Sequence, residues 1–443
     1  MGCRTMDGLQ NPKLSQYDKA SILFAILYPI VPAYFKIGVS FTYIAYIFII
    51  ICSFIMLRRK LFLQLNLTSF CLFFWVIVNV MLYFIHGYFI GAFWTILLAI
   101  AVIVFSVNIK NGYVFQKIIL GICYATGFVC ILGIIESITG INVWSFLNNS
   151  GETIMYNDLR FGMTRIVSFT YQTITYCTYL VLASALVFYA ISFSGNYGKP
   201  VKRNLKIIYV LVCINVALTL SRSAILVFII QQLFLLYKMG FVKLIKRLLQ
   251  LSCTIILILF LVSLVNPYFF IRIRNLFYML LAVFDNSYTK VIAEDFGNDN
   301  LEAVGTRLLI YKWVYEKVRD NLFMGVGYNT PFLYTFTAKS GVYDYIATKK
   351  TIEVEYLFTL YRSGILGLVA EIVALVSIPI MGIKKRFFCA DWENKLSFNY
   401  VISVSFVCLS IQYFFVNQSS EQNLLYLMVA LFLSYNYHHK FTK

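Results

Sequence analysis

The sequence predicts an all-α membrane protein that crosses the bilayer many times. Of its 443 residues, 60% are hydrophobic and 18% are aromatic, and the mean hydropathy is +0.79. Apolar runs long enough to span a bilayer follow one another along the chain, and one polar stretch of about eighty residues interrupts them. These features exclude a soluble globular domain, so we treat residues 1–443 as a single integral membrane domain.

The apolar runs predict about twelve transmembrane helices, and because two runs are short the number is accurate only to one or two spans. The spans before the polar stretch lie near residues 21–35, 38–57, 67–90, 91–107, 115–137, 172–193, 206–219, 223–236 and 248–270. Those after it lie near residues 353–381, 396–416 and 423–437.

Lysines and arginines in the short loops predict which side of the membrane each loop faces, because basic residues next to spans stay in the cytoplasm. The basic clusters all fall on the same side as both termini: Arg58–Lys60, Lys110 with Lys117, Lys199–Lys206, Lys238–Arg247 and Lys384–Arg386. We therefore predict a multi-pass protein with both termini in the cytoplasm. The net charge of +18 mostly sets this orientation, and such short basic loops argue against a nucleic-acid partner.

The ten cysteines predict neither disulfides nor a metal site. All of them fall in predicted spans or cytoplasmic segments, and the CxxC spacing of metal sites is absent. We assign the cysteines to packing.

Two long outer segments interrupt the spans, and arginines stand close to them. Residues 138–171 form the first outer loop, where Arg160 and Arg165 approach the membrane together. Arg222 stands between two serines, where one apolar run gives way to the next with almost no loop. Guanidinium groups pair with phosphate oxygens at any relevant pH, so these arginines predict an anion clamp. The alternative is that they only snorkel to the membrane surface.

The second outer loop, residues 272–352, contains a predicted amphipathic helix at 305–321. Its apolar residues recur at helical spacing, namely Leu308, Tyr311, Val314, Tyr315, Val318 and Leu322. Thr306 is the predicted N-cap, which places Arg307 in the first turn beside free backbone amides that would hold an anion. The alternative is an ordinary surface arginine. The glycines of Gly325-Val326-Gly327 predict a chain reversal after the helix.

Two acids end this loop and lead into the next span. On a helix Glu353 and Glu355 would face about 200° apart, so they could not act there as a close carboxylate pair. An ion pair with Lys349 or Lys350 would be a structural explanation for Glu353. Glu371 would lie on the helical face of Glu353 but roughly 27 Å deeper, too far away to share chemistry. We expect Glu371 to be a structural or conformational element.

The order of these features resembles the superfamily of O-antigen ligases and Wzy-type O-antigen or capsular polysaccharide polymerases. The shared features run from Arg160 to Gly367. They are arginines before a mid-chain span, the Ser-Arg-Ser turn, an outer loop with an arginine-led helix and Gly-x-Gly, then Tyr356-Leu357 and Gly-x-x-Gly. Ligases of this family carry a histidine that aligns with Glu353 here. This departure makes a polymerase the better fit.

The resemblance implies a bacterial inverting glycosyltransferase of the GT-C type, largely helical, that needs no metal or other cofactor. It would use undecaprenyl-diphosphate-linked oligosaccharides at the outer face of the cytoplasmic (inner) membrane. A carboxylate would take the proton of the attacking hydroxyl, and arginines would stabilise the diphosphate leaving group. We assign Glu353 as the candidate base, with Glu355 in reserve. The predicted diphosphate clamp consists of Arg160, Arg165, Arg222 and Arg307.

Other functional classes fit part of the sequence. A transporter or lipid flippase would also have about twelve spans, but the chain shows no internal repeat and its large outer loop is asymmetric. A ligase that attaches finished glycan to lipid A or to a protein is the second alternative, and the missing histidine argues against it. A polymerase would work among membrane lipids, with a chain-length regulator and a flippase as possible partners.

Overall fold

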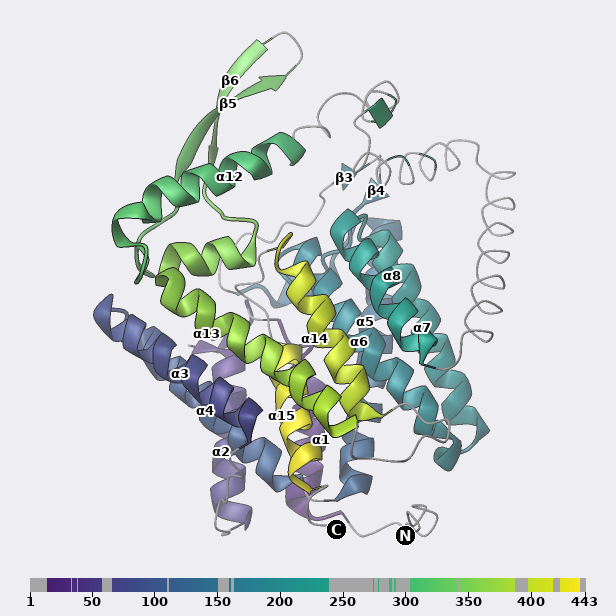
Figure 1. The fold of residues 1–443 in the computed structure, drawn as a ribbon. Coiled ribbons are helices and arrows are strands. Elements are labelled where there is room, and N and C mark those ends of the chain that lie inside the picture. The colour runs from purple at the N-terminus through teal and green to yellow at the C-terminus, as the bar shows by residue number, and fades with distance from the viewer. Residues whose placement is uncertain are drawn as a thin grey trace.

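The computed structural model describes most of the predicted spans and part of the large outer loop (Figure 1). The described residues are 14–32, 34–37, 39–57, 66–109, 111–149, 159–160, 163–238, 303–340, 343–386, 397–416 and 423–438, with the isolated positions 274, 278, 287, 288 and 291. The span predicted at 248–270 lies outside them.

The structure is mostly helical, and its helices lie close to the predicted spans. Before the large outer loop they are α1 (Gln16–Leu27), α2 (Phe41–Leu57), α3 (Leu67–Ile85), α4 (Phe89–Asn108), α5 (Gly112–Thr139), α6 (Thr173–Phe193), α7 (Lys199–Leu218) and α8 (Arg222–Tyr237). After the loop come α13 (Glu355–Arg386), α14 (Phe398–Gln412) and α15 (Asn423–His438). Two 3-10 helices, η1 (Val143–Leu147) and η2 (Ser194–Tyr197), follow α5 and α6.

Local side-chain chemistry sets several helix ends. Ser15 and Asp18 form a capping box at the start of α1, where each side chain accepts the backbone N–H of the other. Asn66 and Asn111 accept backbone N–H groups at the starts of α3 and α5. Gly140 ends α5 in the left-handed conformation, at φ 70°. These capping residues mark where the apolar runs begin and end.

Several helices are suited to cross a membrane. Among the described residues, five are long and apolar enough: α3, α4, α5, α6 and residues Glu355–Gly382 of α13. Shorter apolar helices occur within α2, α8, α14 and α15. The structure therefore supports an integral membrane protein, whereas the total of about twelve spans and the side that each loop faces stay predictions.

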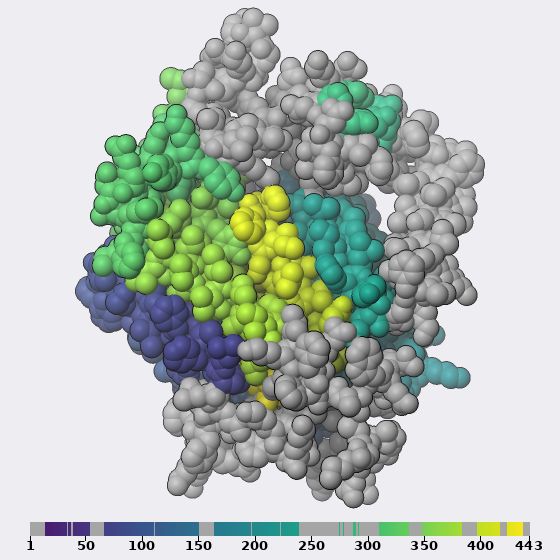
Figure 2. Space-filling model, in the orientation of Figure 1, coloured from purple at the N-terminus to yellow at the C-terminus, as the bar shows by residue number. Residues whose placement is uncertain are grey.

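The helices form a ring around two interior helices. Going round the ring, neighbours in contact are α3, α13, α14, α8, α7, α5, α1, α2 and α4, which returns to α3. Helices α6 and α15 lie inside and contact each other as well as α14. Nearly every side chain of α6 is buried, as expected for a helix that is apolar all round. Figure 2 shows α13 on one face of the ring, between α3 and α14.

The outer part between α8 and α13 contains α12 (Ala303–Val318), η4 (Arg319–Asn321) and an antiparallel hairpin of β5 (Tyr334–Ser340) and β6 (Tyr343–Lys349). Figure 1 shows this part beyond one end of the helix ring. The hairpin is a small addition to a mostly helical structure, and β-branched and aromatic residues recur along both of its strands. Two shorter hairpins pair β1 (Lys36–Ile37) with β2 (Val39–Ser40) and β3 (Leu159–Arg160) with β4 (Met163–Thr164).

Helix α12 confirms the helix predicted at 305–321, but it starts earlier than expected. It begins at Ala303, so Thr306 lies inside the first turn and is not the N-cap. Arg307 falls in the second turn as a result. The expectation that Arg307 sits among the free amides of the helix start was therefore wrong.

The buried face of α12 also differs from the prediction. Ile310, Val314 and Val318 are fully buried and pack against Phe332, Tyr334, Ile352 and Tyr361. Tyr311 and Tyr315, which the periodicity assigned to the apolar face, are exposed. The difference arises because spacing by four residues aligns Ile310, Val314 and Val318 on one line of the helix, which covers the start of α13.

Candidate active site

A cavity of about 1070 Å³ lies between α2, α3, α4, α13 and α15. This volume is at the upper limit of sites for drug-sized ligands, roughly 300–1,000 Å³, so it has room for an extended substrate. Its aromatic wall comprises Tyr43, Tyr46, Phe73, Trp75, Tyr83, Tyr88, Trp94, Tyr171, Tyr328, Phe358, Phe406, Tyr413 and Tyr426. Its charged residues are Lys36, Glu355, Arg362 and Glu371. Aromatic rings with a few charges suit a ligand that is both apolar and ionic.

A break in α13 shapes one wall of this cavity. At Gly364 the backbone has φ 64° and ψ −165°, a conformation that is essentially restricted to glycine. The break separates a short first part, which carries Glu355 and Arg362, from the long second part, which carries Glu371. The two parts can thus present charged residues from different directions to one cavity.

The loop at Gly325-Val326-Gly327 packs against the break in α13 at Gly364. Four backbone hydrogen bonds join the loop region to α13, with the donor named first: Val326 to Tyr361 (2.7 Å), Gly327 to Arg362 (3.1 Å), Ile365 to Leu322 (2.9 Å) and Leu366 to Phe323 (3.2 Å). They occupy amide and carbonyl groups that an unbroken helix would bond internally. A side chain at Gly325 would collide with the backbone of Arg362 and Gly364. The loop predicted as a chain reversal therefore also forms hydrogen bonds that replace those missing at the break in α13.

The two predicted acids have different surroundings because α13 begins between them. Glu355 is the first residue of α13, is only 6% exposed and lines the cavity. Its N–H donates to the carbonyl oxygen of Val416 at 3.2 Å, which fixes the start of the helix against the end of α14. Glu353 precedes the helix and is not among the residues that line the cavity. Burial, and then the charge of Glu353, raises the pKa of Tyr334 to about 12.

Glu371 shares the cavity with Glu355. Its Oε2 atom is buried and has no hydrogen-bond partner among the described residues. The predicted distance of roughly 27 Å between Glu353 and Glu371 assumed one continuous helix that contains both residues. In the structure α13 begins after Glu353 and is broken at Gly364. Glu371 is therefore not excluded from the site on grounds of distance.

Arg165 lies next to the Ser-Arg-Ser turn. Its Nε donates to the carbonyl oxygen of Thr219 at 3.1 Å, and Arg222 follows three residues later as the first residue of α8. The turn is as short as the sequence predicts, since α7 ends at Leu218 and α8 begins at Arg222. The structure thus brings Arg165 to the backbone that carries Arg222.

The buried carboxylate of Glu136 fixes the loop that carries Arg165. It accepts the N–H groups of Val167 at 3.1 Å and Ser168 at 2.9 Å, and the side-chain amide of Asn142 at 3.1 Å. The same loop continues to Tyr171, which lines the cavity. The loop therefore links the Arg165–Arg222 region to the cavity.

The other predicted arginines lie in separate elements. Arg160 lies in β3, opposite Met163, and Arg307 lies in α12. The side chains of Arg160, Arg222 and Arg307 fall outside the described part of the structure. A clamp formed by all of these arginines stays a prediction.

Arg362 is a cavity residue that the sequence analysis missed. Its guanidinium carbon lies 4.0 Å from the ring centroid of Phe358 and 5.9 Å from that of Tyr328. The signal was its spacing, because a residue seven positions after Glu355 lies on the same helical face.

One segment, which contains several of these residues, is similar to a known family. Residues 207–372 match the O-antigen ligase family model. This O-antigen ligase segment includes Arg222, Arg307, Glu355 and Arg362, whereas Arg160 and Arg165 precede it. The resemblance seen in the sequence is thereby confirmed. No curated protein matches the chain.

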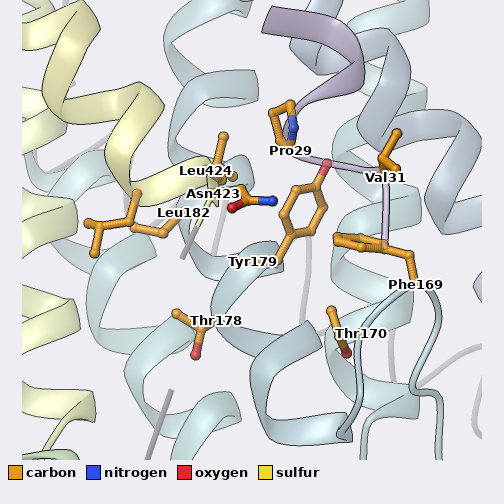
Figure 3. Close-up of a pocket in the computed structure, with 10 residues that line it drawn as sticks. Pro29, Val31, Phe169, Thr170, Thr178, Tyr179, Leu182, Asn423 and Leu424 are labelled. Atoms are coloured by element: carbon orange, nitrogen blue, oxygen red, sulfur yellow. The ribbon is translucent and has the colours of Figure 1, made fainter. Parts of the chain in front are cut away.

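Two further features concern metal binding and a second cavity. Within the described part of the chain, no group of three or more His, Cys, Asp and Glu residues could hold a metal ion. A second cavity has a volume of about 20 Å³. Figure 3 shows residues that line it, among them Tyr179 and Asn423. This cavity is large enough for one water molecule and too small for a sugar, so we place no substrate there.

Proposed function

We propose that the protein is a polysaccharide polymerase. It would transfer glycan from an undecaprenyl-diphosphate carrier to a hydroxyl of another lipid-linked repeat unit, with inversion at the anomeric carbon. The observation that carries this proposal is a buried carboxylate, Glu355, in a large aromatic cavity built partly by the O-antigen ligase segment. O-antigen ligases act on lipid-linked oligosaccharides, which fits a cavity among membrane helices.

Glu355 is the proposed general base. The acceptor hydroxyl oxygen attacks the anomeric carbon, and its proton passes to the Glu355 carboxylate. The bond between the anomeric carbon and the diphosphate oxygen breaks, and its electron pair leaves with the diphosphate. A positioned base contributes about 10² to 10⁴ in rate. Glu355 replaces Glu353 in this role because, of these two acids, Glu355 lines the cavity and Glu353 does not.

Arginines supply the positive charge that the leaving diphosphate needs. Arg165 and Arg222 are the proposed core of this clamp, and the hydrogen bond from Arg165 to the Thr219 carbonyl oxygen, three residues before Arg222, supports their pairing. Arg307 and Arg160 would support them from the outer segments. Fixed guanidinium groups stabilise developing negative charge without a metal ion, so the reaction should persist in EDTA.

One assay distinguishes a polymerase from a ligase and from a flippase. It uses the purified protein in liposomes with undecaprenyl-diphosphate-linked repeat units. A polymerase produces a ladder of repeats on a gel, in the presence of EDTA. A ligase produces a single transfer to an added lipid A acceptor and no ladder. A flippase moves the substrate across the bilayer without making a product. Either of the last two results contradicts the proposal.

A further inference from the structure

We propose that Arg362 and the tyrosines around it form a second anion-binding site, which takes an acidic group of the acceptor glycan. This inference rests on the proposed glycosyl transfer and adds a specificity site to it. The acidic group would be the carboxylate of an acidic sugar or the diphosphate of the acceptor lipid. Both are oxyanions attached to the same substrate, and guanidinium binds both.

The first argument is that the charge of Arg362 is available. Among the described residues, Arg362 has no ion pair and no side-chain hydrogen bond, although it lines the cavity with Glu355. Its guanidinium carbon lies over the ring of Phe358, 4.0 Å from the ring centroid. Packing on one face leaves the N–H groups at the edge free to point into the cavity. The charge of Glu355 acts on Arg362 within the cavity without forming an ion pair, so an anionic group of the substrate can still bind the guanidinium.

The second argument is the aromatic wall beside Arg362. The ring centroids of Tyr83 and Tyr328 lie 4.1 Å apart, and those of Tyr88 and Tyr328 lie 6.2 Å apart. Tyr328 donates its hydroxyl to Oδ1 of Asn79 at 3.2 Å, which links the loop after α12 to α3. Burial raises the pKa of Tyr328, so this hydroxyl stays protonated. Neutral tyrosines flank an anion without repelling it and offer flat faces to sugar rings.

The third argument is position. Arg362 lies seven residues after Glu355 on the unbroken first part of α13, which is about 10 Å along the helix axis. An anion on Arg362 would therefore lie away from the reacting hydroxyl at Glu355, on the same substrate. The Arg165–Arg222 region, proposed for the leaving diphosphate, reaches the cavity through the loop that ends at Tyr171, whereas Arg362 belongs to α13. Arg362 is thus placed to hold the acceptor and not the leaving group of the donor.

The test is equilibrium binding of small probes to the full chain in detergent. The probes are methyl glucuronide, its neutral counterpart methyl glucoside, and inorganic pyrophosphate. Tryptophan fluorescence is the readout, because Trp75 and Trp94 line the same cavity. The variants are Arg362→Gln, Arg362→Lys and the control Arg319→Gln, whose side chain is 65% exposed. Binding requires no turnover, so this test is independent of whether the protein polymerises glycan.

We expect at least one anionic probe to bind more tightly than methyl glucoside. Arg362→Gln should weaken that binding roughly ten- to hundredfold, Arg362→Lys should weaken it less, and Arg319→Gln should not change it. An effect on glucuronide identifies an acidic sugar as the source of the anion, and an effect on pyrophosphate identifies the lipid diphosphate. If Arg362→Gln alters neither affinity while the protein remains folded, the proposed site is wrong.

Discussion

Glu355 is held in the cavity by its immediate neighbours. Ile352 and Val354, which flank Glu353, are nearly fully buried, and the Glu355 N–H is bonded to Val416. This fixes the chain on both sides of the point where α13 begins. Glu355 is only 6% exposed, and burying a charged group costs free energy. Its place beside an aromatic cavity fits use in proton transfer.

Arg222 offers a direct test of the diphosphate clamp. Arg222→Lys keeps the charge but removes the planar fork that binds two phosphate oxygens together. We expect the rate of repeat addition to fall at least tenfold, consistent with the loss of about 1.5–3 kcal/mol from a charged hydrogen bond. The measurement is the initial rate of ladder formation by purified protein.

The matched control is Arg319→Lys, because Arg319 lies in η4 with an exposed side chain. It should retain the wild-type rate. If Arg222→Lys is equally active, Arg222 serves only to snorkel at the membrane surface.

At the scale of residues, the sequence predicted some neighbours and missed others. It predicted the tight turn at Arg222, and the structure adds Arg165 to it. It could not choose between Glu353 and Glu355, because that choice depends on the residue at which a helix begins. Arg362 was missed because the cavity that it lines is built from α2, α3, α4 and α15, which no local pattern relates to α13.

The broken helix α13 and the Gly325–Gly327 loop form one structural element. The loop supplies hydrogen bonds that α13 loses at Gly364. Because Glu355 and Arg362 both lie on the short part before the break, their placement depends on this element. The outer loop is thereby coupled to the proposed site.

Gly364→Ala tests this coupling. Alanine is strained at φ 64° and ψ −165°, and its Cβ would collide with the carbonyl group of Phe323. We expect a loss of about 2 kcal/mol or more in stability, with reduced activity. The measurement is the melting temperature of the protein in detergent, together with its polymerisation rate.

Gly195→Ala is the control for that variant, since a Cβ at Gly195 would meet no atom within 4 Å. It should melt within a degree or so of the wild type. Equal melting temperatures for both variants would show that α13 tolerates a regular conformation at Gly364.

At the scale of elements, long apolar runs were predicted well. The span expected at 172–193 is α6, Thr173–Phe193, because an apolar run of that length has few alternatives to a helix. The outer segments were predicted less well. The β5–β6 hairpin was missed, although β-branched and aromatic residues in two seven-residue strands indicate it. The buried face of α12 depends on α13 and Phe332, which are distant in sequence.

The orientation of the whole molecule is still a prediction, which rests on the basic residues of the short loops. Ile346 in β6 is 78% exposed and is expected outside, whereas Lys202 in α7 is exposed and is expected in the cytoplasm. A membrane-impermeant maleimide should label Ile346→Cys in intact spheroplasts. It should label Lys202→Cys only after permeabilisation.

The wild-type protein is the background for this labelling, since its described cysteines are buried or half-buried. The reverse pattern would place the hairpin in the cytoplasm. It would also contradict an outward-facing active site.

At the scale of the whole molecule, composition alone predicted a polytopic membrane protein, and the match of residues 207–372 confirmed the resemblance to O-antigen ligases. The cavity could not be predicted, because it forms between helices from both ends of the chain. Its position, with Glu355 in its wall, is the basis of the proposed mechanism.

The most direct test compares repeat addition by wild-type protein, Glu355→Gln and Glu353→Gln in one ladder assay. Glutamine keeps the size and polarity of the side chain but cannot accept the proton. We expect Glu355→Gln to slow repeat addition by about 10² to 10⁴, and Glu353→Gln to stay near the wild-type rate. If Glu353→Gln abolishes the ladder and Glu355→Gln does not, the cavity carboxylate is not the base and the proposed mechanism is wrong.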